Sequence, residues 1–182
     1  MGMAAPVYYS ADMVRALPDD GNRYETVRGE LLVTPAPREL HQRALGRLFL
    51  ALGNYLVRHP VGALYTSPAD ISWGPDILVQ PDLFVAALEE ARTGEWSRFR
   101  TLLLAVEVLS PTTGRQDRFT KRRLYQEVRV AAYWVVDADA RAVEAWTPES
   151  RFPQVVTDAL TWRPAGASEL FTLSLAELFR PL

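Results

Sequence analysis

Two acidic residues stand inside stretches of the sequence that are otherwise apolar. Glu107 is the only charged residue between Leu102 and Leu109, and Asp82 directly precedes the apolar residues Leu83 to Val85. A buried carboxylate is costly unless a cation, hydrogen bonds or a metal ion compensates its charge. Two such acids on neighbouring core strands can converge on a divalent cation, which accepts oxygen ligands. The pattern therefore predicts either a metal site or a structural ion pair at these two carboxylates.

Lys121 is the only lysine among the 20 basic residues of the chain. Its ammonium is a compact charge whose pKa moves readily, whereas a guanidinium is planar, bulky and always charged. Lys121 shares one face of an expected helix with Asp117, Leu124 and Tyr125, and the apolar members of that face must pack on a sheet. Lys121 is therefore expected to point inward or along the edge of the sheet, where its ammonium could come near Glu107. The alternative is one lysine retained by chance on a solvated helix.

Two carboxylates and a nearby lysine suit metal-assisted phosphodiester hydrolysis. The acids would hold a metal that polarises the phosphate and lowers the pKa of water, and the lysine would orient that water or offset developing charge. The chain has no cysteine and only two histidines, which excludes disulfides, thiolate nucleophiles and cysteine-ligated metals. A catalytic metal would then be held mainly by carboxylates, which favours Mg²⁺ or Mn²⁺.

The overall composition is that of an ordinary globular protein. The 182 residues fit one domain, with 48% hydrophobic and 23% charged residues. The formal net charge of -2 argues against a protein that coats nucleic acid non-specifically. The sequence shows no signal-peptide pattern and no apolar stretch of the roughly 20 residues that a membrane span needs. We therefore expect a cytoplasmic protein with no membrane partner.

Apolar periodicity and turn residues indicate the elements that must position these side chains. A long amphipathic helix is expected over Glu39–His59, ended by Pro60, and another helix over Arg115–Val128. Shorter helices are expected after Ser10 and over Ser174–Phe179. The expected strands are Tyr24–Val27, Glu30–Thr34, Ala63–Thr66, Ile71–Trp73, Leu83–Val85, Thr101–Leu109, Ala132–Val136 and Arg141–Trp146, with short strands near Val155 and Phe171. Strands interleaved with two substantial helices indicate an α/β fold of the mixed α+β kind, a mixed sheet with helices packed on it.

Several motifs, taken in order, resemble one known family. They are Tyr24-Glu25, Gly29-Glu30-Leu31, Pro35-Ala36-Pro37 with His41-Gln42, Val79-Gln80-Pro81-Asp82-Leu83, Val106-Glu107-Val108-Leu109-Ser110-Pro111-Thr112-Thr113, Asp117, Lys121, Tyr125 and Tyr133-Trp134-Val135-Val136-Asp137. Over about residues 23–137 this pattern resembles the Uma-two family of restriction-endonuclease-like proteins, within the PD-(D/E)xK nuclease superfamily. The resemblance implies a restriction-endonuclease-like central mixed sheet flanked by helices and a divalent-metal site. A single domain is then expected over residues 1–182, with its core at about 23–146 and a C-terminal extension over 147–182.

The resemblance also implies roles for individual residues. Asp82 matches the aspartate of the Pro-Asp motif and Glu107 the second acid, and the backbone carbonyl of Val108 would be a further ligand of Mg²⁺ or Mn²⁺. Leu109 stands where such nucleases usually carry their lysine, and Lys121 matches the position on the following helix to which the family's lysine is thought to have moved. Residues 129–132, Arg-Val-Ala-Ala, depart from the glycine, proline and acid that relatives tend to have, a difference that we interpret as local to the entry of a strand.

Two further residues are weaker candidates for the site. By position in the superfamily, Glu30 is the amino-terminal candidate for an additional metal-binding acid; the alternative is a solvated acid beside the Gly29 turn. His41 begins the long helix, where it could contact phosphate, but capping of the first helical turn is the favoured prediction.

A nucleic acid is the expected substrate. Between Arg115 and Arg129 six basic residues stand against two acids, an excess that could neutralise a phosphate backbone. We expect metal-dependent cleavage of DNA by a homodimer whose paired sites cut both strands. One alternative is an inactive nuclease fold that binds nucleic acid or regulates another protein. Another is a glycosidase that uses two carboxylates without a metal.

Overall fold

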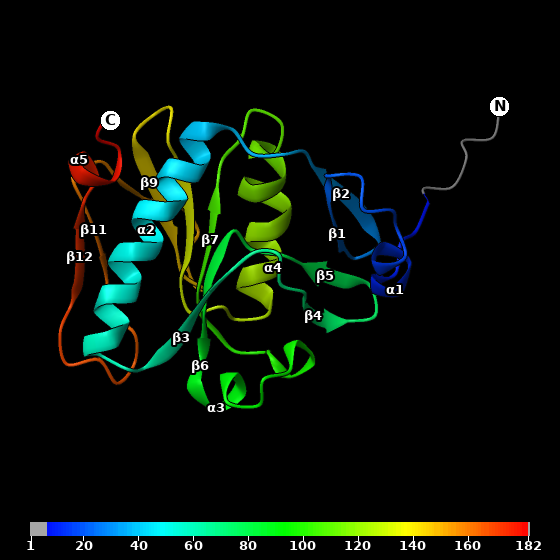
Figure 1. Ribbon diagram of the computed structural model, residues 1–182, viewed down its shortest axis with the longest axis horizontal. Helices are drawn as coiled ribbons and strands as arrows, with labels where there is room; N and C mark the ends of the chain where they lie inside the picture. Colours follow the sequence, from blue (N-terminus) through cyan, green and yellow to red (C-terminus); the bar gives the residue numbers. More distant parts are fainter. Residues whose placement is uncertain (1–6, 182) are drawn as a thin grey trace.

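The core of the protein is a six-stranded sheet. A computed structural model describes residues 7–181, and Figure 1 shows how their helices and strands are arranged. The sheet has the order β10-β9-β8-β7-β6-β3, formed by β3 (Gly62–Thr66), β6 (Leu83–Ala87), β7 (Leu102–Val108), β8 (Tyr133–Asp137), β9 (Ala142–Trp146) and β10 (Gln154–Val156). Strands β7 and β8 are parallel and the other neighbouring pairs are antiparallel. The prediction of a central mixed sheet is confirmed.

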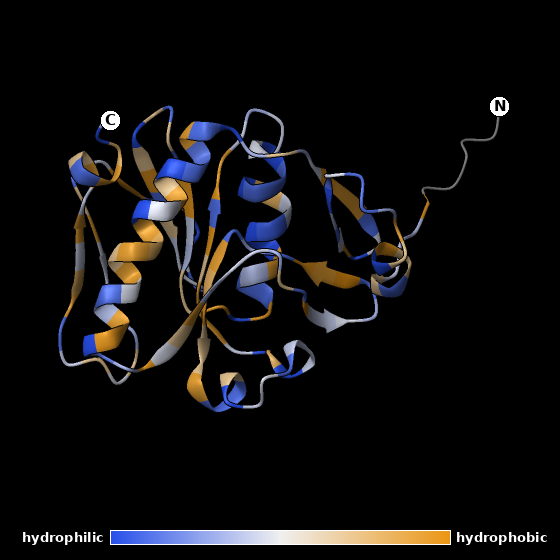
Figure 2. Cartoon of the chain, viewed as in Figure 1, coloured by the Kyte–Doolittle hydropathy of each residue, from blue (hydrophilic) through white to orange (hydrophobic). Residues whose placement is uncertain are grey.

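One face of this sheet packs against the long helix α2 (Glu39–Arg58). Leu48, Leu52 and Leu56 of α2 are buried against Val85 and Leu104 of the sheet, because residues at three- and four-residue steps share one side of a helix. Figure 2 shows the mixture of hydrophobic and hydrophilic residues along α2 that this packing requires. The same face also carries the C-terminal elements β11 (Ala159–Trp162), β12 (Phe171–Ser174) and α5 (Leu175–Leu178).

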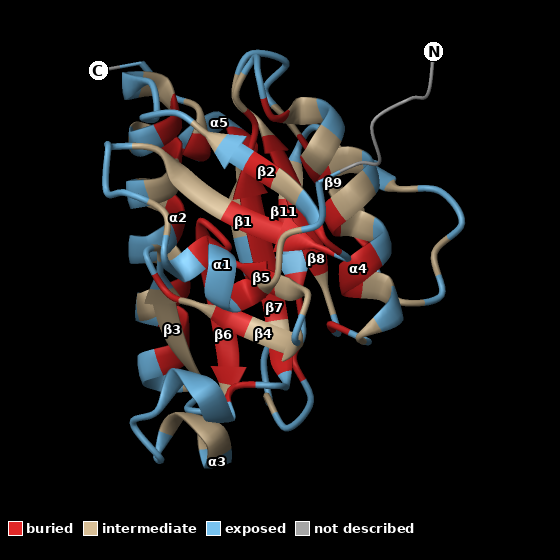
Figure 3. Cartoon of the chain, turned by 90° about the vertical axis from the view of Figure 1, so that its right-hand side faces the viewer, coloured by how far each residue is buried: buried red, intermediate tan, exposed pale blue. Residues whose placement is uncertain are grey.

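The opposite face is covered by a second sheet and by the helix that follows β7. This second sheet has the order β2-β1-β5-β4, and its strands are β1 (Arg23–Val27), β2 (Glu30–Thr34), β4 (Ile71–Gly74) and β5 (Ile77–Val79). Helix α1 (Ala11–Arg15) packs on it, capped by Ser10 as expected. The helix after β7 begins as a π-helical turn, η2 (Gln116–Lys121), and continues as α4 (Arg122–Glu127). In Figure 3 the buried part of β1 crosses in front of the buried strands β6, β7 and β8.

Most of the expected elements are present with boundaries shifted by a few residues. The elements that were not predicted are β5, β11 and the short helices α3 (Leu88–Ala91) and η1 (Trp96–Arg98), which lead from β6 into β7. Beyond residue 146 the chain adds β10 to the edge of the central sheet and contributes Leu160 and Phe171 to its core. None of the helices in the described part of the chain is long and apolar enough to cross a membrane.

Candidate active site

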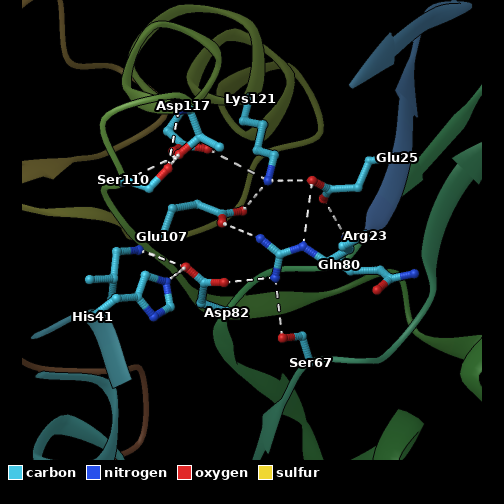
Figure 4. Close-up of polar contacts among 12 residues, drawn as sticks. Arg23, Glu25, His41, Ser67, Gln80, Asp82, Glu107, Ser110, Asp117 and Lys121 are labelled. Carbon is cyan, nitrogen blue, oxygen red and sulfur yellow. Dashed lines mark hydrogen bonds and ion pairs between the residues drawn. The ribbon is translucent and has the colours of Figure 1, made fainter. Parts of the chain in front are cut away.

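Strand alternation brings Asp82 and Glu107 to the same face of the central sheet. Val106 and Val108 pack toward α2, so Glu107, between them, points to the opposite face. Leu83 pairs with Val106 in the antiparallel register, which leaves Asp82, the preceding residue, opposite Glu107. Both side chains are almost fully buried, with 3% and 1% of their surface exposed. The structure therefore places the two predicted acids side by side, as Figure 4 shows.

The carboxylate of Asp82 is held by three donors. Its Oδ2 accepts hydrogen bonds from the backbone N–H of Val108 at 2.8 Å and from Nε2 of His41 at 3.0 Å. Its Oδ1 accepts from Nη1 of Arg23 at 2.7 Å. Burial alone would raise the pKa of Asp82, but the His41 hydrogen bond and the Arg23 charge outweigh burial and lower it well below its usual value. Asp82 is therefore an ionised carboxylate.

The prediction that His41 caps the long helix is wrong. The N-cap position of α2 is Arg38, which makes no capping bond with its side chain. His41 lies one turn further on, where its ring is buried and reaches across to the carboxylate of Asp82. Because an ionised carboxylate can only accept, Nε2 of His41 carries the proton.

Glu107 lies deeper than Asp82 and meets different donors. Its Oε1 accepts hydrogen bonds from Nζ of Lys121 at 3.0 Å and from the hydroxyl of Tyr125 at 3.1 Å. Burial raises the pKa of Glu107 well above its usual value, and repulsion from Asp82 adds to this effect, while the Lys121 charge partly opposes it. Glu107 is thus the acid of the pair that gives up its proton less readily.

Lys121 is a buried ammonium among three carboxylates. Its Nζ lies 2.7 Å from Oε2 of Glu25, 3.0 Å from Oε1 of Glu107 and 3.6 Å from Oδ1 of Asp117. Only 1% of the residue is exposed, so it is not a solvated surface lysine. Burial alone would lower the pKa of Lys121, but the carboxylates of Glu107, Glu25 and Asp117 outweigh burial and raise it. Lys121 therefore stays protonated.

Two residues of β1, Arg23 and Glu25, belong to the cluster. Glu25 stands in one of the family-like motifs, but neither residue was predicted to be part of the site. Alternation puts both on the same face of β1, which lies over the central sheet. Oε1 of Glu25 accepts a hydrogen bond from the backbone N–H of Gln80 at 2.7 Å, and Oε2 meets Lys121. Nη2 of Arg23 lies 4.0 Å from Oε2 of Glu107. The signal available in the sequence was an acid and a base two residues apart in a strand, although alternation alone does not say which face is buried.

Glu30, in contrast, lies outside this cluster. It opens β2 beside the turn at Arg28 and Gly29, pairs with Val27 in the hairpin register, and is exposed. The amino-terminal acid that reaches Lys121 is Glu25, from the middle of the partner strand. We therefore replace Glu30 by Glu25 in the candidate site.

The basic excess on the helix after β7 is largely used within the protein. Arg118 forms ion pairs with Asp137 at 3.0 Å and with Glu144 at 2.7 Å. Arg122 lies over the ring of Trp146, and Arg129 pairs with Glu149. With Lys121 buried in the acidic cluster, these contacts engage four of the six basic residues of this segment within the protein.

The cluster borders a pocket of about 910 Å³. Arg23, His41, Asp82, Val108 and Asp117 all contribute to its wall. Glu107 and Lys121 lie behind this wall, with Arg23 reaching between Asp82 and Glu107 (Figure 4). The pocket thus gives solvent access to Asp82 and Arg23 first.

The donors of the cluster suit a hard divalent cation. Four carboxylates, those of Glu25, Asp82, Glu107 and Asp117, surround two cations, Arg23 and Lys121, which leaves two formal negative charges in excess when every acid is ionised. Oxygen donors with excess negative charge are the ligands that Mg²⁺ and Mn²⁺ prefer. Within residues 7–181 no three histidine or acid side chains are arranged to hold a metal as they stand. The chemistry of the donors therefore fits the cation, and their arrangement requires a side chain to move.

The fold and the site define a class of protein, the restriction-endonuclease-like α+β proteins with a buried acidic cluster at the central sheet. The chain belongs to the Uma2 family, whose model, described as "Putative restriction endonuclease", matches residues 11–176. It is also similar to a solved structure described as a "putative nuclease belonging to DUF820 from Anabaena variabilis ATCC 29413". That likeness has a TM-score of 0.79 at 21% identity and covers 94% of this chain and 97% of the other, which shows a shared fold. No curated protein matches the chain.

Proposed function

We propose that this protein is a nuclease that hydrolyses phosphodiester bonds of DNA with the help of Mg²⁺ or Mn²⁺. The observation that carries the proposal is the pair of facing carboxylates, Asp82 and Glu107, beside a pocket and within a cluster of four carboxylates and two cations. Membership of a family described as restriction endonucleases, and the nuclease description of the Anabaena protein, support it.

Asp82 and Glu107, with the backbone carbonyl of Val108, would hold the cation. A bound divalent metal supplies Lewis-acid polarisation of a phosphate and a water molecule of lowered pKa. His41 and the Val108 N–H fix one oxygen of Asp82, which orients the carboxylate before any cation arrives. The pre-oriented carboxylate reduces the cost of assembling the site.

Lys121 has a narrower role than the sequence suggested. Its raised pKa keeps it an ammonium near neutral pH, so it cannot accept a proton from water. Its charge, 3.0 Å from Glu107, opposes the effect of burial on the pKa of that acid and offsets negative charge that develops near the acids. Of the two roles expected for this lysine, we favour charge compensation.

The proposal is tested by DNA cleavage with purified protein. Supercoiled plasmid incubated with Mg²⁺ or Mn²⁺ should be nicked or linearised, and the metal chelator EDTA should stop the reaction. Asp82→Ala should lower the rate by at least about 100-fold, the scale of losing one group that stabilises the transition state. Glu30→Ala, which changes an exposed acid outside the cluster, should cleave at the wild-type rate. Absence of any metal-dependent cleavage that Asp82→Ala abolishes would contradict the proposal.

One observation favours a second candidate function, an inactive nuclease fold that binds nucleic acid. Nη1 of Arg23 bonds directly to Asp82, at the point where a nuclease needs its acid available to a cation. In that case short DNA duplexes would bind without being cut, and neither binding nor stability would respond to Mn²⁺.

We also propose that the nuclease acts as a homodimer, since paired sites can cut both strands without release of a nicked intermediate. Light scattering on the purified chain tests this directly. Linear product formed without a nicked intermediate would support paired sites, whereas a monomeric mass at assay concentration would contradict them.

A further inference from the structure

Each of the two central acids has one oxygen held by fixed donors and one oxygen that faces Arg23. In Asp82, Oδ2 is held by Val108 and His41, whereas Oδ1 meets only Nη1 of Arg23 and no other donor in the described residues. In Glu107, Oε1 is held by Lys121 and Tyr125, whereas Oε2 lies 4.0 Å from Nη2 of Arg23. One guanidinium therefore lies against the two oxygens that remain for a metal ion.

The guanidinium of Arg23 is held less firmly than the other cation of the cluster. Only Nη1 makes short contacts, at 2.7 Å to Asp82 and 3.2 Å to Oγ of Ser67. Its Nε is buried and has no hydrogen-bond partner in the described residues. The side chain is 19% exposed and lines the pocket, whereas Lys121 is enclosed behind it. The guanidinium of Arg23 therefore makes few bonds where it lies, and the pocket beside it offers space into which it can move.

We propose that Arg23 is an internal counter-ion that closes the acid pair in the metal-free protein and withdraws into the pocket when a divalent cation binds. The inference rests on the proposed function, because it concerns the same metal site. An ion of charge +2 in place of a guanidinium of charge +1 is attracted more strongly to the two facing carboxylates. The withdrawn guanidinium stays at the pocket wall, where it can pair with a phosphodiester group of DNA. Metal and DNA binding then strengthen each other, because both favour the open position of Arg23.

Calorimetry with Mn²⁺ tests the competition between Arg23 and the cation. Arg23→Gln should bind Mn²⁺ at least about 10-fold more tightly than wild type, since no guanidinium has to be displaced. Arg15→Gln is the matched control: Arg15 lines the same pocket but pairs with Asp12 and Asp70, so its loss should change the affinity by less than about 2-fold. A short non-cleavable DNA duplex should tighten Mn²⁺ binding by wild type and should do so much less for Arg23→Gln.

The outcomes separate this inference from the proposed function. If wild type binds Mn²⁺ through Asp82, as shown by loss of binding in Asp82→Ala, but Arg23→Gln binds no more tightly, the site stands and the counter-ion role fails. If Arg15→Gln gains as much affinity for Mn²⁺ as Arg23→Gln, the gain comes from the loss of any positive charge near the pocket, and the counter-ion role of Arg23 also fails. If neither wild type nor Arg23→Gln binds Mn²⁺, both proposals fail.

A measurement on the wild-type chain avoids any effect of Arg23→Gln on folding. The Nε–Hε signal of Arg23 in a ¹⁵N–¹H spectrum, assigned by its absence in Arg23→Lys, should show slow proton exchange in the metal-free protein because Nε is buried. Saturating Mg²⁺ should move this signal to the position and fast exchange of solvent-exposed arginines. An unchanged signal at saturating Mg²⁺ would overturn the proposal.

Discussion

Lys121 shows how one ammonium can stabilise several acids that burial would otherwise keep neutral. Its Nζ lies within 3.6 Å of oxygens from Glu25, Glu107 and Asp117, which come from three different elements. A lysine suits this point because its three donors radiate from one small charged group, whereas a guanidinium spreads its donors over a plane. The single lysine of the chain therefore lies at a point surrounded by three carboxylates, where a compact cation fits better than a planar one.

Replacement of Lys121 by Met should lower the free energy of unfolding by about 3–5 kcal/mol near neutral pH, because it leaves buried carboxylates without their cation. Lys121→Arg keeps the charge but overfills the site, and a loss of about 1–3 kcal/mol is expected. Urea unfolding monitored by tryptophan fluorescence measures both variants. A Lys121→Met protein as stable as wild type would show that the cluster tolerates its acids in neutral form.

The pH dependence of Lys121→Met follows from the raised pKa values of Glu107 and Asp117, which burial causes and Lys121 partly opposes. A raised folded-state pKa means that the folded protein holds protons more tightly than the unfolded chain, so this contribution to stability is greatest at low pH and is lost as pH rises through the folded pKa. Without Lys121 both pKa values rise further. The stability deficit of Lys121→Met should therefore shrink as pH falls from 8 toward about 4.3, the unfolded value of glutamate. A deficit that is constant with pH contradicts this account.

At the scale of elements, the site depends on strands whose two faces are both buried. β7 sends Val106 and Val108 to one face and Glu107 to the other, so its single charge is directed into the cluster. The π-helical turn η2 (Gln116–Lys121) then places Asp117 and Lys121 on the same inward side of the following helix. Such turns are rare and recur at functional sites. This one contains both residues that the helix adds to the cluster, Asp117 and Lys121.

Elements with a strong apolar period were predictable, and elements defined only by their partners were not. The leucine spacing of Glu39–His59 predicted α2 to within one residue at its C-terminal end, and the apolar run Thr101–Leu109 predicted β7 equally well. β11 (Ala159–Trp162) is short and exists through its pairing with β12, which no local pattern reveals. Asp82 and Glu107 were found because a charge in a buried strand is anomalous. Arg23 was not found and the contact of His41 with Asp82 was not foreseen, since both depend on tertiary contacts.

The surroundings of two glycines, Gly62 in the edge strand β3 of the central sheet and Gly53 in helix α2, predict opposite effects for their substitution. A Cβ at Gly62 would lie 2.5 Å from Cγ1 of Val85 and 2.9 Å from the backbone oxygen of Ala86, so Gly62→Ala should destabilise the protein by about 1–3 kcal/mol. In helix α2 the nearest atom to a Cβ at Gly53 is 3.8 Å away, so Gly53→Ala should stabilise it by about 0.5–1 kcal/mol. Urea unfolding of the two variants provides the comparison, and a shift in the same direction for both would contradict the packing described here.

At the scale of the whole molecule, the acidic cluster connects the two larger sheets through ion pairs. Arg23 and Glu25 come from β1 of the four-stranded sheet. Asp82 directly precedes β6 of the six-stranded sheet, and Glu107 lies in β7 of the same sheet. Lys121 comes from the helix that connects β7 to β8. Ion pairs that cross from one sheet to the other make the position of the β1–β2 hairpin depend on the charge state of the site. If the proposed cation binds among these acids, its binding and the attachment of this hairpin are therefore coupled.

The coupling predicts that loss of Glu25 loosens the hairpin more than the central sheet. Glu25→Ala removes the 2.7 Å contact with Lys121 and the acceptor for the buried N–H of Gln80, a loss of at least about 1.4 kcal/mol. Backbone amides of β1 and β2 should then exchange with deuterium about 10-fold faster or more, while amides of β7 and β8 keep their protection.

Glu30→Ala is the matched control for this prediction, because Glu30 lies on the same hairpin but is exposed. Its exchange should equal that of wild type throughout the described strands, since no ion pair between the sheets is removed. Equal acceleration by Glu25→Ala in both sheets would mean that the molecule opens only as a unit, and equal behaviour of the two variants would mean that the cluster does not hold the hairpin. Faster exchange confined to β1 and β2 in Glu25→Ala alone would identify the acidic cluster as the contact that holds the hairpin on the central sheet.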